Sequence, residues 1–170
     1  GATDKVIKNI TFGSWPEAVA YDPSNGYLYV ADFGWGSVSV INGATNTVIT
    51  NITVGSWPDG VAFDSSNGYV YVANSGSNSV SVINGATNTV IATIAVGTYP
   101  WGLAYDSSNG YVYVANYGSN GTVSVINGAT NTVIKTIAVG NNPEGAAFDS
   151  SNGYVYVANY GSANVSVING

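Results

Sequence analysis

Acidic and aromatic side chains recur at matching points of this chain, in loops that otherwise differ from one another. Glu17, Asp59 and Glu144 each follow a proline, and Trp101 takes the same place after Pro100. Rings supply flat apolar area with a polar tip, and carboxylates accept hydroxyl protons, so the combination suits sugars. The alternative is that the rings plug a narrow opening and pack between neighbouring units. The candidate binding residues are Trp15, Glu17, Trp35, Trp57, Asp59, Tyr99, Trp101, Tyr117, Glu144 and Tyr160.

The residue types that the chain lacks exclude much catalytic chemistry. It contains no His, no Cys and no Arg. Ser–His and Cys–His nucleophile pairs therefore cannot be built, nor can ordinary zinc, copper, haem or iron–sulfur sites. Carboxylates alone could hold a hard cation or hydrolyse a glycoside as a pair, but no further residue supports either idea. We expect no enzyme activity, no metal and no cofactor.

The charge of the chain limits the classes of partner that it could bind. The net charge is −6 with only three basic residues, which argues against nucleic acid and against an anionic membrane surface. No apolar run approaches the roughly 18 residues of a spanning helix. Charged residues make up 7% of the chain, so Asn, Ser and Thr must solvate the surface. Together with four Asn-x-Ser/Thr triplets, this favours an extracellular or cell-surface location. The candidate N-glycosylation sites are Asn9, Asn51, Asn120 and Asn164.

A unit of about 42 residues is repeated along the chain. The phrase Gly-Ala-Thr-Asn-Thr-Val begins at Gly43, Gly85 and Gly128, and a diverged copy begins at Gly1. The sequence therefore predicts a single repeat domain over 1–170. Its four units are 1–42, 43–84, 85–127 and 128–169, with the blades offset from them by one strand.

Each unit predicts four short strands. In the second unit they are 48–54, 59–63, 69–73 and 79–83, separated by Gly-, Asn- and Ser-rich turns. Tyr-Val-Tyr-Val at 69–72 is apolar on both faces, whereas a sheet with one wet face would alternate apolar and polar residues. Each small sheet is therefore covered on both sides. This predicts an all-β fold: a β-propeller of four four-stranded antiparallel blades.

The two ends of the chain are complementary in this scheme. Residues 6–12 read as an outermost strand without a unit of its own, and residues 165–168 end a unit that lacks its outermost strand. Pairing them would close the ring and remove the open sheet edges. The alternatives are four blades of a larger ring, or two chains forming a ring of eight blades. In a four-stranded meander, the two variable loops of each unit emerge on one side, so the candidate binding residues should share one rim.

The phrase Tyr-Val-Tyr-Val-Ala-Asn, with Ser-Val-Ser-Val-Ile-Asn-Gly and Thr-Val-Ile-x-x-Ile, resembles the YVTN-type β-propeller repeats across the whole chain. Such repeats are similar to those of archaeal surface-layer and cell-surface proteins. The resemblance implies a non-enzymatic structural and interaction module, whose partners would be other copies of itself, surface proteins or glycans. Related propellers include lactonases and lyases, whose catalytic residues include His or Arg, and this chain has neither. The alternatives are a carbohydrate-binding or adhesion module, an engineered or excised propeller with no function of its own, and a hydrolase or lyase.

Overall fold

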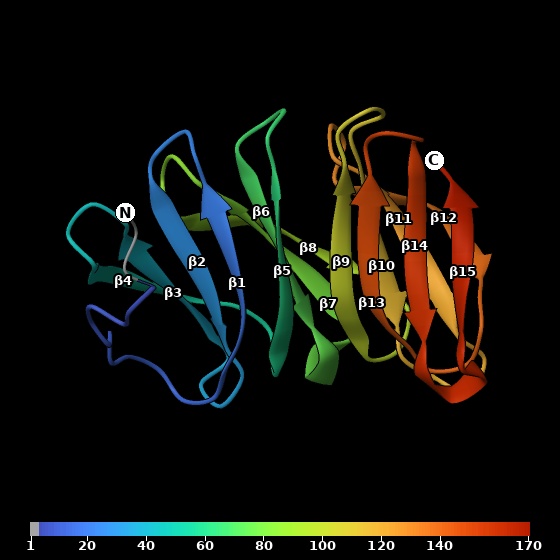
Figure 1. Ribbon diagram of the computed structural model, residues 1–170, viewed down its shortest axis with the longest axis horizontal. Helices are drawn as coiled ribbons and strands as arrows, with labels where there is room; N and C mark the ends of the chain where they lie inside the picture. Colours follow the sequence, from blue (N-terminus) through green and yellow to red (C-terminus); the bar gives the residue numbers. More distant parts are fainter. Residues whose placement is uncertain (1–3) are drawn as a thin grey trace.

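The computed structural model describes residues 4–170, which form four small antiparallel sheets side by side (Figure 1). Three sheets have four strands and the last has three, and each follows chain order as a meander. The strands are β1 (Pro16–Asp22), β2 (Tyr27–Asp32), β3 (Ser37–Asn42), β4 (Thr47–Thr53), β5 (Pro58–Asp64), β6 (Tyr69–Asn74), β7 (Ser79–Asn84), β8 (Thr89–Ala95), β9 (Pro100–Asp106), β10 (Tyr111–Asn116), β11 (Thr122–Asn127), β12 (Thr132–Ala138), β13 (Pro143–Asp149), β14 (Tyr154–Asn159) and β15 (Asn164–Asn169). The all-β propeller fold predicted from the sequence is confirmed.

The first hairpin of each blade closes through the repeated Asp-x-Ser-Asn-Gly turn. Asp22 Oδ1 accepts hydrogen bonds from the backbone N–H and the hydroxyl of Ser24, at 2.8 and 2.6 Å. Gly26 ends the turn with φ 75°, a conformation that glycine adopts without a Cβ clash. Asp64, Asp106 and Asp149 make the same bonds in the other blades. The repeated aspartate therefore shapes a turn.

Neighbouring blades pack face to face through apolar side chains. Tyr29 and Val38 of the first blade join Val70 and Val72 of the second in one core, and all four are fully buried. Burying one such side chain contributes roughly 1.5–3 kcal/mol. The next pair of blades shares an equivalent core around Tyr71. The burial of both faces that the Tyr-Val-Tyr-Val pattern predicts is therefore found.

Hydrogen bonds at one end of the blades reinforce this packing. The Tyr29 hydroxyl donates to the Gly85 carbonyl at 3.2 Å and reaches Asn88 Oδ1 at 2.9 Å. Tyr71 makes the same pair of contacts one blade further on, to Gly128 and Asn131. The innermost strands also follow one another, with β1 beside β5, β5 beside β9 and β9 beside β13. The same contacts thus repeat from blade to blade.

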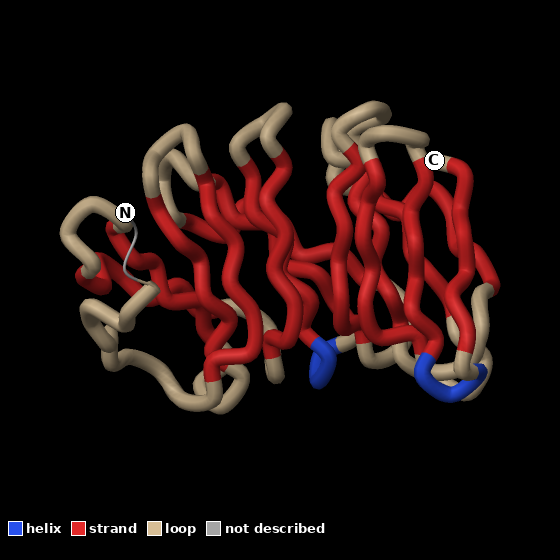
Figure 2. Tube along the Cα trace, viewed as in Figure 1, coloured by secondary structure: helices blue, strands red, loops and turns tan. Residues whose placement is uncertain are grey.

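The ring closure predicted from the chain ends is not present in this structure. Residues 6–12 form no strand and run as a loop before β1 (Figure 2), with Val6 82% exposed. The last sheet accordingly has three strands, and β1 and β13 lie apart in an open arc (Figure 1). Sheets that pack face to face lie about 10 Å apart. Side chains such as Tyr29 and Tyr71 fill the space between neighbouring blades, and their size limits the angle between one blade and the next. The other arrangements expected from the sequence, four blades of a larger ring and two chains forming a ring of eight blades, both leave one chain as an open arc.

Candidate functional site

The two variable loops of each blade lie together, at the same edge of every blade. The N–H of Phe33 donates to the carbonyl of Trp15 at 3.0 Å, and the N–H of Ser75 donates to that of Trp57 at 2.8 Å. The third blade joins its loops likewise, through Tyr117 and Tyr99 at 2.9 Å. We call these paired loops the aromatic rim: residues 13–16 with 33–36, 55–58 with 75–78, 97–100 with 117–121, and 140–143 with 160–163.

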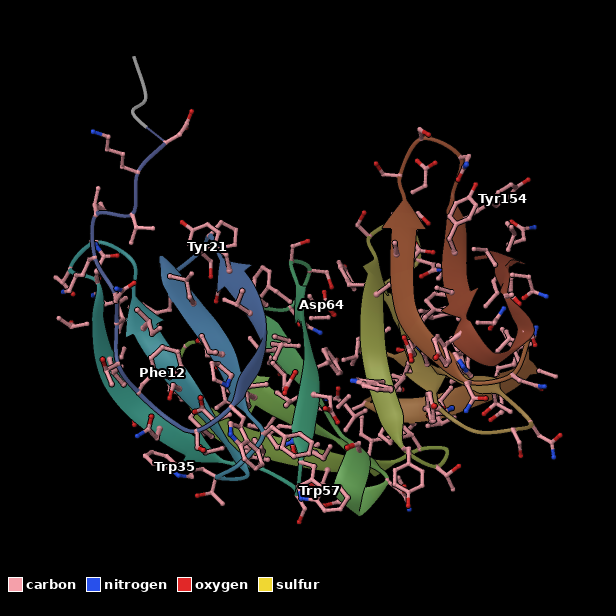
Figure 3. All side chains as sticks on the ribbon, turned by 60° about the horizontal axis from the view of Figure 1, so that its bottom comes forward. Phe12, Tyr21, Trp35, Trp57, Asp64 and Tyr154 are labelled. Atoms are coloured by element: carbon pink, nitrogen blue, oxygen red, sulfur yellow. The ribbon has the colours of Figure 1, made fainter. Side chains whose placement is uncertain are left out.

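Figure 3 shows the side chains of Trp35 and Trp57 at this edge of the blades, and Tyr21 and Tyr154 at the opposite edge. The first pair belongs to the rim, and the second pair lies beside the Asp-x-Ser-Asn-Gly turns. The structure therefore places the variable loops of all blades on one side. The nearly constant turns that join the first two strands of each blade lie on the other side.

Three aromatic residues of the rim have a left-handed backbone. The φ angles of Trp15, Trp57 and Tyr99 are 55°, 54° and 49°, and the equivalent residue of the fourth blade, Asn142, has φ 51°. This conformation costs a residue with a Cβ roughly 1–2 kcal/mol, and Asn tolerates it better than bulky side chains do. Backbone preference therefore does not account for the aromatic rings at these positions.

The rim contains an aromatic cavity of about 380 Å³ between the second and third blades. Such a volume is typical of sites for small ligands. Phe33 of the first blade stacks on Trp57, with ring centroids 5.7 Å apart and an interplanar angle of 13°. Trp101 meets Tyr117 edge to face at 5.1 Å. The cavity is lined by Phe33, Trp57, Asp59, Ser75, Tyr99, Trp101 and Tyr117.

Asp59 supplies the one carboxylate of this cavity. Its side chain is 8% exposed. Burial raises the pKa of the Asp59 carboxyl and the negative charge of Glu17 raises it further, whereas a hydrogen bond from Ser75 lowers it. A buried carboxylate gains from every additional donor that reaches it. The cavity thus combines apolar walls with a strong hydrogen-bond acceptor.

A second hollow of about 600 Å³ follows the innermost strands below the rim. Asp59, Trp101 and Glu144 line it at their equivalent positions, together with glycines such as Gly60 and Gly102. Asp59 and Trp101 line both hollows, so the two adjoin at β5 and β9.

The structure brings together five of the ten candidate binding residues: Trp57, Asp59, Tyr99, Trp101 and Tyr117. The others lie outside the cavity. Glu144 and Tyr160 share a separate hollow on the fourth blade. Trp15 and Trp35 are 68% and 62% exposed on the first blade, and Glu17 is exposed as well.

Two lining residues, Phe33 and Ser75, are not among the candidates chosen from the sequence. Both follow the last residue of the second strand in their blades, as Tyr117 and Tyr160 do. Aligning the units at this position would have indicated them, whereas a search for Trp and Tyr alone misses them.

All four candidate N-glycosylation asparagines are solvent-exposed. Asn51 Oδ1 accepts a hydrogen bond from Ser39 at 2.8 Å, and Asn164 Oδ1 accepts one from Asn159 at 2.8 Å. Over residues 4–170, the acidic side chains form no group of three that could hold a metal ion. The only helices along the same residues are two short 3-10 turns, and neither is long enough to cross a membrane.

No protein-family model matches the chain, and no curated protein matches it. Among solved structures, the chain is similar to the hydrazine synthase of Kuenenia stuttgartiensis, with a TM-score of 0.82 and 22% sequence identity. The similarity covers 98% of this chain and 48% of that one, so the chain spans about half the length of its structural neighbour. At this identity the likeness concerns the fold, and it agrees with the repeated blades seen here.

Proposed function

We propose that this protein is a non-enzymatic recognition module of a cell surface, and that it binds carbohydrate in the aromatic cavity. The observation that carries the proposal is the arrangement of Phe33, Trp57, Tyr99 and Trp101 around the acceptor Asp59. Their rings are partly open to solvent, and Trp57 is 49% exposed. A ligand that covers them would remove further apolar area from water.

Sugars fit this chemistry because they present C–H faces to rings and hydroxyl groups to acceptors. The Trp57 and Phe33 rings lie nearly parallel, which gives the cavity a flat wall. Asp59 accepts protons from hydroxyl groups, and its low exposure favours a ligand that supplies donors. The cavity has no basic lining residue, so it suits a neutral sugar better than an acidic one.

The absence of enzymatic activity is part of the proposal. Glycoside hydrolysis ordinarily uses two carboxylates that flank the bond to be broken. Asp59 is the only carboxylate that lines the aromatic cavity. The chain contains no His, Cys or Arg to act in its place or beside it.

A cell-surface location is supported by the sequence and by the exposure of its sequons. The YVTN-type phrases resemble repeats of surface proteins, and only 7% of the residues are charged. Asn9 and Asn120 carry exposed side chains at which a glycan would meet solvent. Intact-mass analysis of the protein from its native source tests this part of the proposal directly.

The binding proposal is tested with a glycan array, followed by titration of the best ligand monitored by Trp fluorescence. We expect Trp57→Ala and Trp101→Ala to weaken binding at least tenfold, which corresponds to about 1.4 kcal/mol. Trp35→Ala is the matched control, because it removes the same ring from the same rim outside the cavity. Absence of glycan binding, or affinity unchanged by both cavity variants, would refute the carbohydrate proposal.

A further inference from the structure

The fourth blade ends in an unpaired and partly apolar edge. β15 pairs with β14 on one side, and within residues 4–170 no strand pairs with its other side. Val165 and Val167 of this strand are each 56% exposed. Their equivalents in the first blade, Val38 and Val40, are fully buried between blades. The fourth blade therefore presents a surface that is covered everywhere else along the arc.

Residues 6–12 have the sequence of the strand that this edge lacks. Except at Lys8, Val6-Ile7-Lys8-Asn9-Ile10-Thr11 matches Val48-Ile49-Thr50-Asn51-Ile52-Thr53, which lies within β4 beside β3. Asp4 has φ 44°, close to the 53° of Asn46, which occupies the same repeat position before β4. Among residues 4–170, the segment nevertheless pairs with no strand.

Within residues 4–170, hydrogen bonds from a strand tyrosine to the glycine turn of the next blade are made by the first two blades and not by the third or fourth. In the first two blades, Tyr29 and Tyr71 bond to the glycine turn of the next blade. Asn25 adds a bond to the Gly85 carbonyl at 3.1 Å. In the third blade, the Tyr113 hydroxyl accepts a bond from Asn109 of its own blade at 3.4 Å. In the fourth blade, Tyr156 and Asn152 bond to each other at 2.9 Å and, within residues 4–170, to no following turn.

The opposite end of the arc has the complementary free face. Val19 and Tyr21 of β1 are 60% and 55% exposed. Their equivalents in the second blade, Val61 and Phe63, pack into the core against the first blade. The face of the first blade is therefore of the kind that packs onto a preceding blade, and the face of the fourth blade is of the kind that packs onto a following one.

We propose that a second copy of this chain joins the two ends, with residues 6–12 of each copy forming the fourth strand of the other copy's last sheet. The pairing of Val38 with Ile52 in the first blade sets the register, so Val165 would lie opposite Ile10 of the partner subunit. Tyr156 would then bond to Gly43 of the partner subunit, as Tyr29 bonds to Gly85 within one chain. Two such head-to-tail junctions close a ring of eight blades, within the range of known propellers.

The open arc favours a second copy over closure within one chain. Closing four blades alone would require β1 to reach β13, and these strands lie at opposite ends in Figures 1 and 3. A partner arc continues the blade-to-blade packing already present at three places in the chain, without a sharper turn. It also covers the edge of β15, which would otherwise remain open to unspecific strand pairing.

The mass of the full chain in solution is the first test. Light scattering after size exclusion should give twice the mass of the 17.4 kDa chain. Val165→Lys should raise the dimer dissociation constant at least tenfold, because it places a charge within the junction. Ile91→Lys is the matched control: Ile91 is 44% exposed on β8, outside the junction, and this variant should remain a dimer. A monomer at every concentration, or a species larger than a dimer, would overturn the eight-bladed ring.

Cross-linking distinguishes a dimer from a chain closed on itself. The protein has no cysteine, so Ile10→Cys combined with Val165→Cys introduces one defined pair. Oxidation should give a covalent dimer on a non-reducing gel and leave Ile49→Cys with Ile91→Cys monomeric. A cross-linked monomer would overturn the proposal in favour of a four-bladed ring. If the unmodified protein is a monomer in solution and still binds glycan, the junction is refuted and the proposed function stands.

Discussion

Gly60 is the position where a single methyl group should disturb the blade arrangement most clearly. It lies on β5, one residue after Asp59, where the innermost strands of two blades approach each other. A Cβ at Gly60 would meet the carbonyl oxygen of Trp101 on β9 and lie 2.7 Å from Leu103 Cδ1. Ordinary contacts of a Cβ are 3.4–4 Å. Since one of the opposing atoms is backbone, β5 and β9 must move apart to admit the methyl group.

The expected magnitude follows from two opposing effects. Overpacking of a close contact typically costs 1–3 kcal/mol. Replacing Gly by Ala also restricts the unfolded chain, which stabilises the folded state by about 0.4–1 kcal/mol where the backbone allows it. Gly60 has no positive φ, so this gain applies. We therefore expect Gly60→Ala to lower the free energy of unfolding by about 1–2 kcal/mol. Because Asp59 and Trp101 line the aromatic cavity, glycan affinity should fall as well.

Urea denaturation monitored by Trp fluorescence measures the change. The matched control is Gly118→Ala, since a Cβ there would meet only the Thr98 hydroxyl, at 3.7 Å, and its φ is not positive. We expect the control to be unchanged or more stable by up to about 1 kcal/mol. If Gly60→Ala is as stable as the Gly118→Ala control, then the close approach of β5 to β9 does not limit the packing of the blades, and the reasoning is wrong.

Two further predictions concern the tyrosines of the core and the rim. Burial raises the pKa of Tyr71 to about 12 from an ordinary value of 10.0, so between these pH values the folded state holds a proton that the unfolded state has released. The free energy of unfolding should therefore fall as pH rises through this window, by up to about 1.4 kcal/mol per pH unit. Tyr71→Phe should reduce the slope of this fall in a series of denaturation experiments at alkaline pH. An unchanged slope would show that Tyr71 does not hold the proton. Tyr99→Asn should weaken glycan binding and leave the free energy of unfolding within about 1 kcal/mol, because relief of the left-handed backbone offsets the loss of a ring that is 53% exposed. Destabilisation beyond about 2 kcal/mol in thermal or urea unfolding would show that the Tyr99 ring is a packing element.

Much of the fold could be predicted because its determinants are local. The Tyr-Val-Tyr-Val strands, apolar on both faces, required sheets covered on both sides, and the Asn-Gly turns fixed which strands pair. The structure adds the hydrogen bonds from Tyr29 and Tyr71 to the next blade, which no strand pattern specifies. Ring closure depends on the angle between blades, which arises from many side-chain contacts at once, and strand complementarity alone led to the wrong intramolecular pairing.

The candidate site could be predicted only in part, for a related reason. Equal positions in the units placed Trp57, Asp59 and Trp101 on one side of the arc, but the sequence does not say which blades share a cavity. Phe33 reaches Trp57 because neighbouring blades bring the loops of different units together. The left-handed backbone of Tyr99 is also invisible in its sequence, since Gly or Asn would be the expected residue there.

The backbone at the rim bears on whether its rings plug the arc or recognise a ligand. A ring that serves only as a plug gains most when it is fully buried, as Tyr71 is. Trp57 and Tyr99 instead remain about half exposed and occupy a backbone conformation that costs roughly 1–2 kcal/mol. The free energy gained by their partial burial therefore exceeds the cost of this conformation by little. Asp59 beside them is buried and no basic residue lines the cavity, so its carboxylate carries a desolvation cost as well. A ligand that covers both rings and donates hydrogen bonds to Asp59 would offset all three costs together, and this favours recognition over a plug.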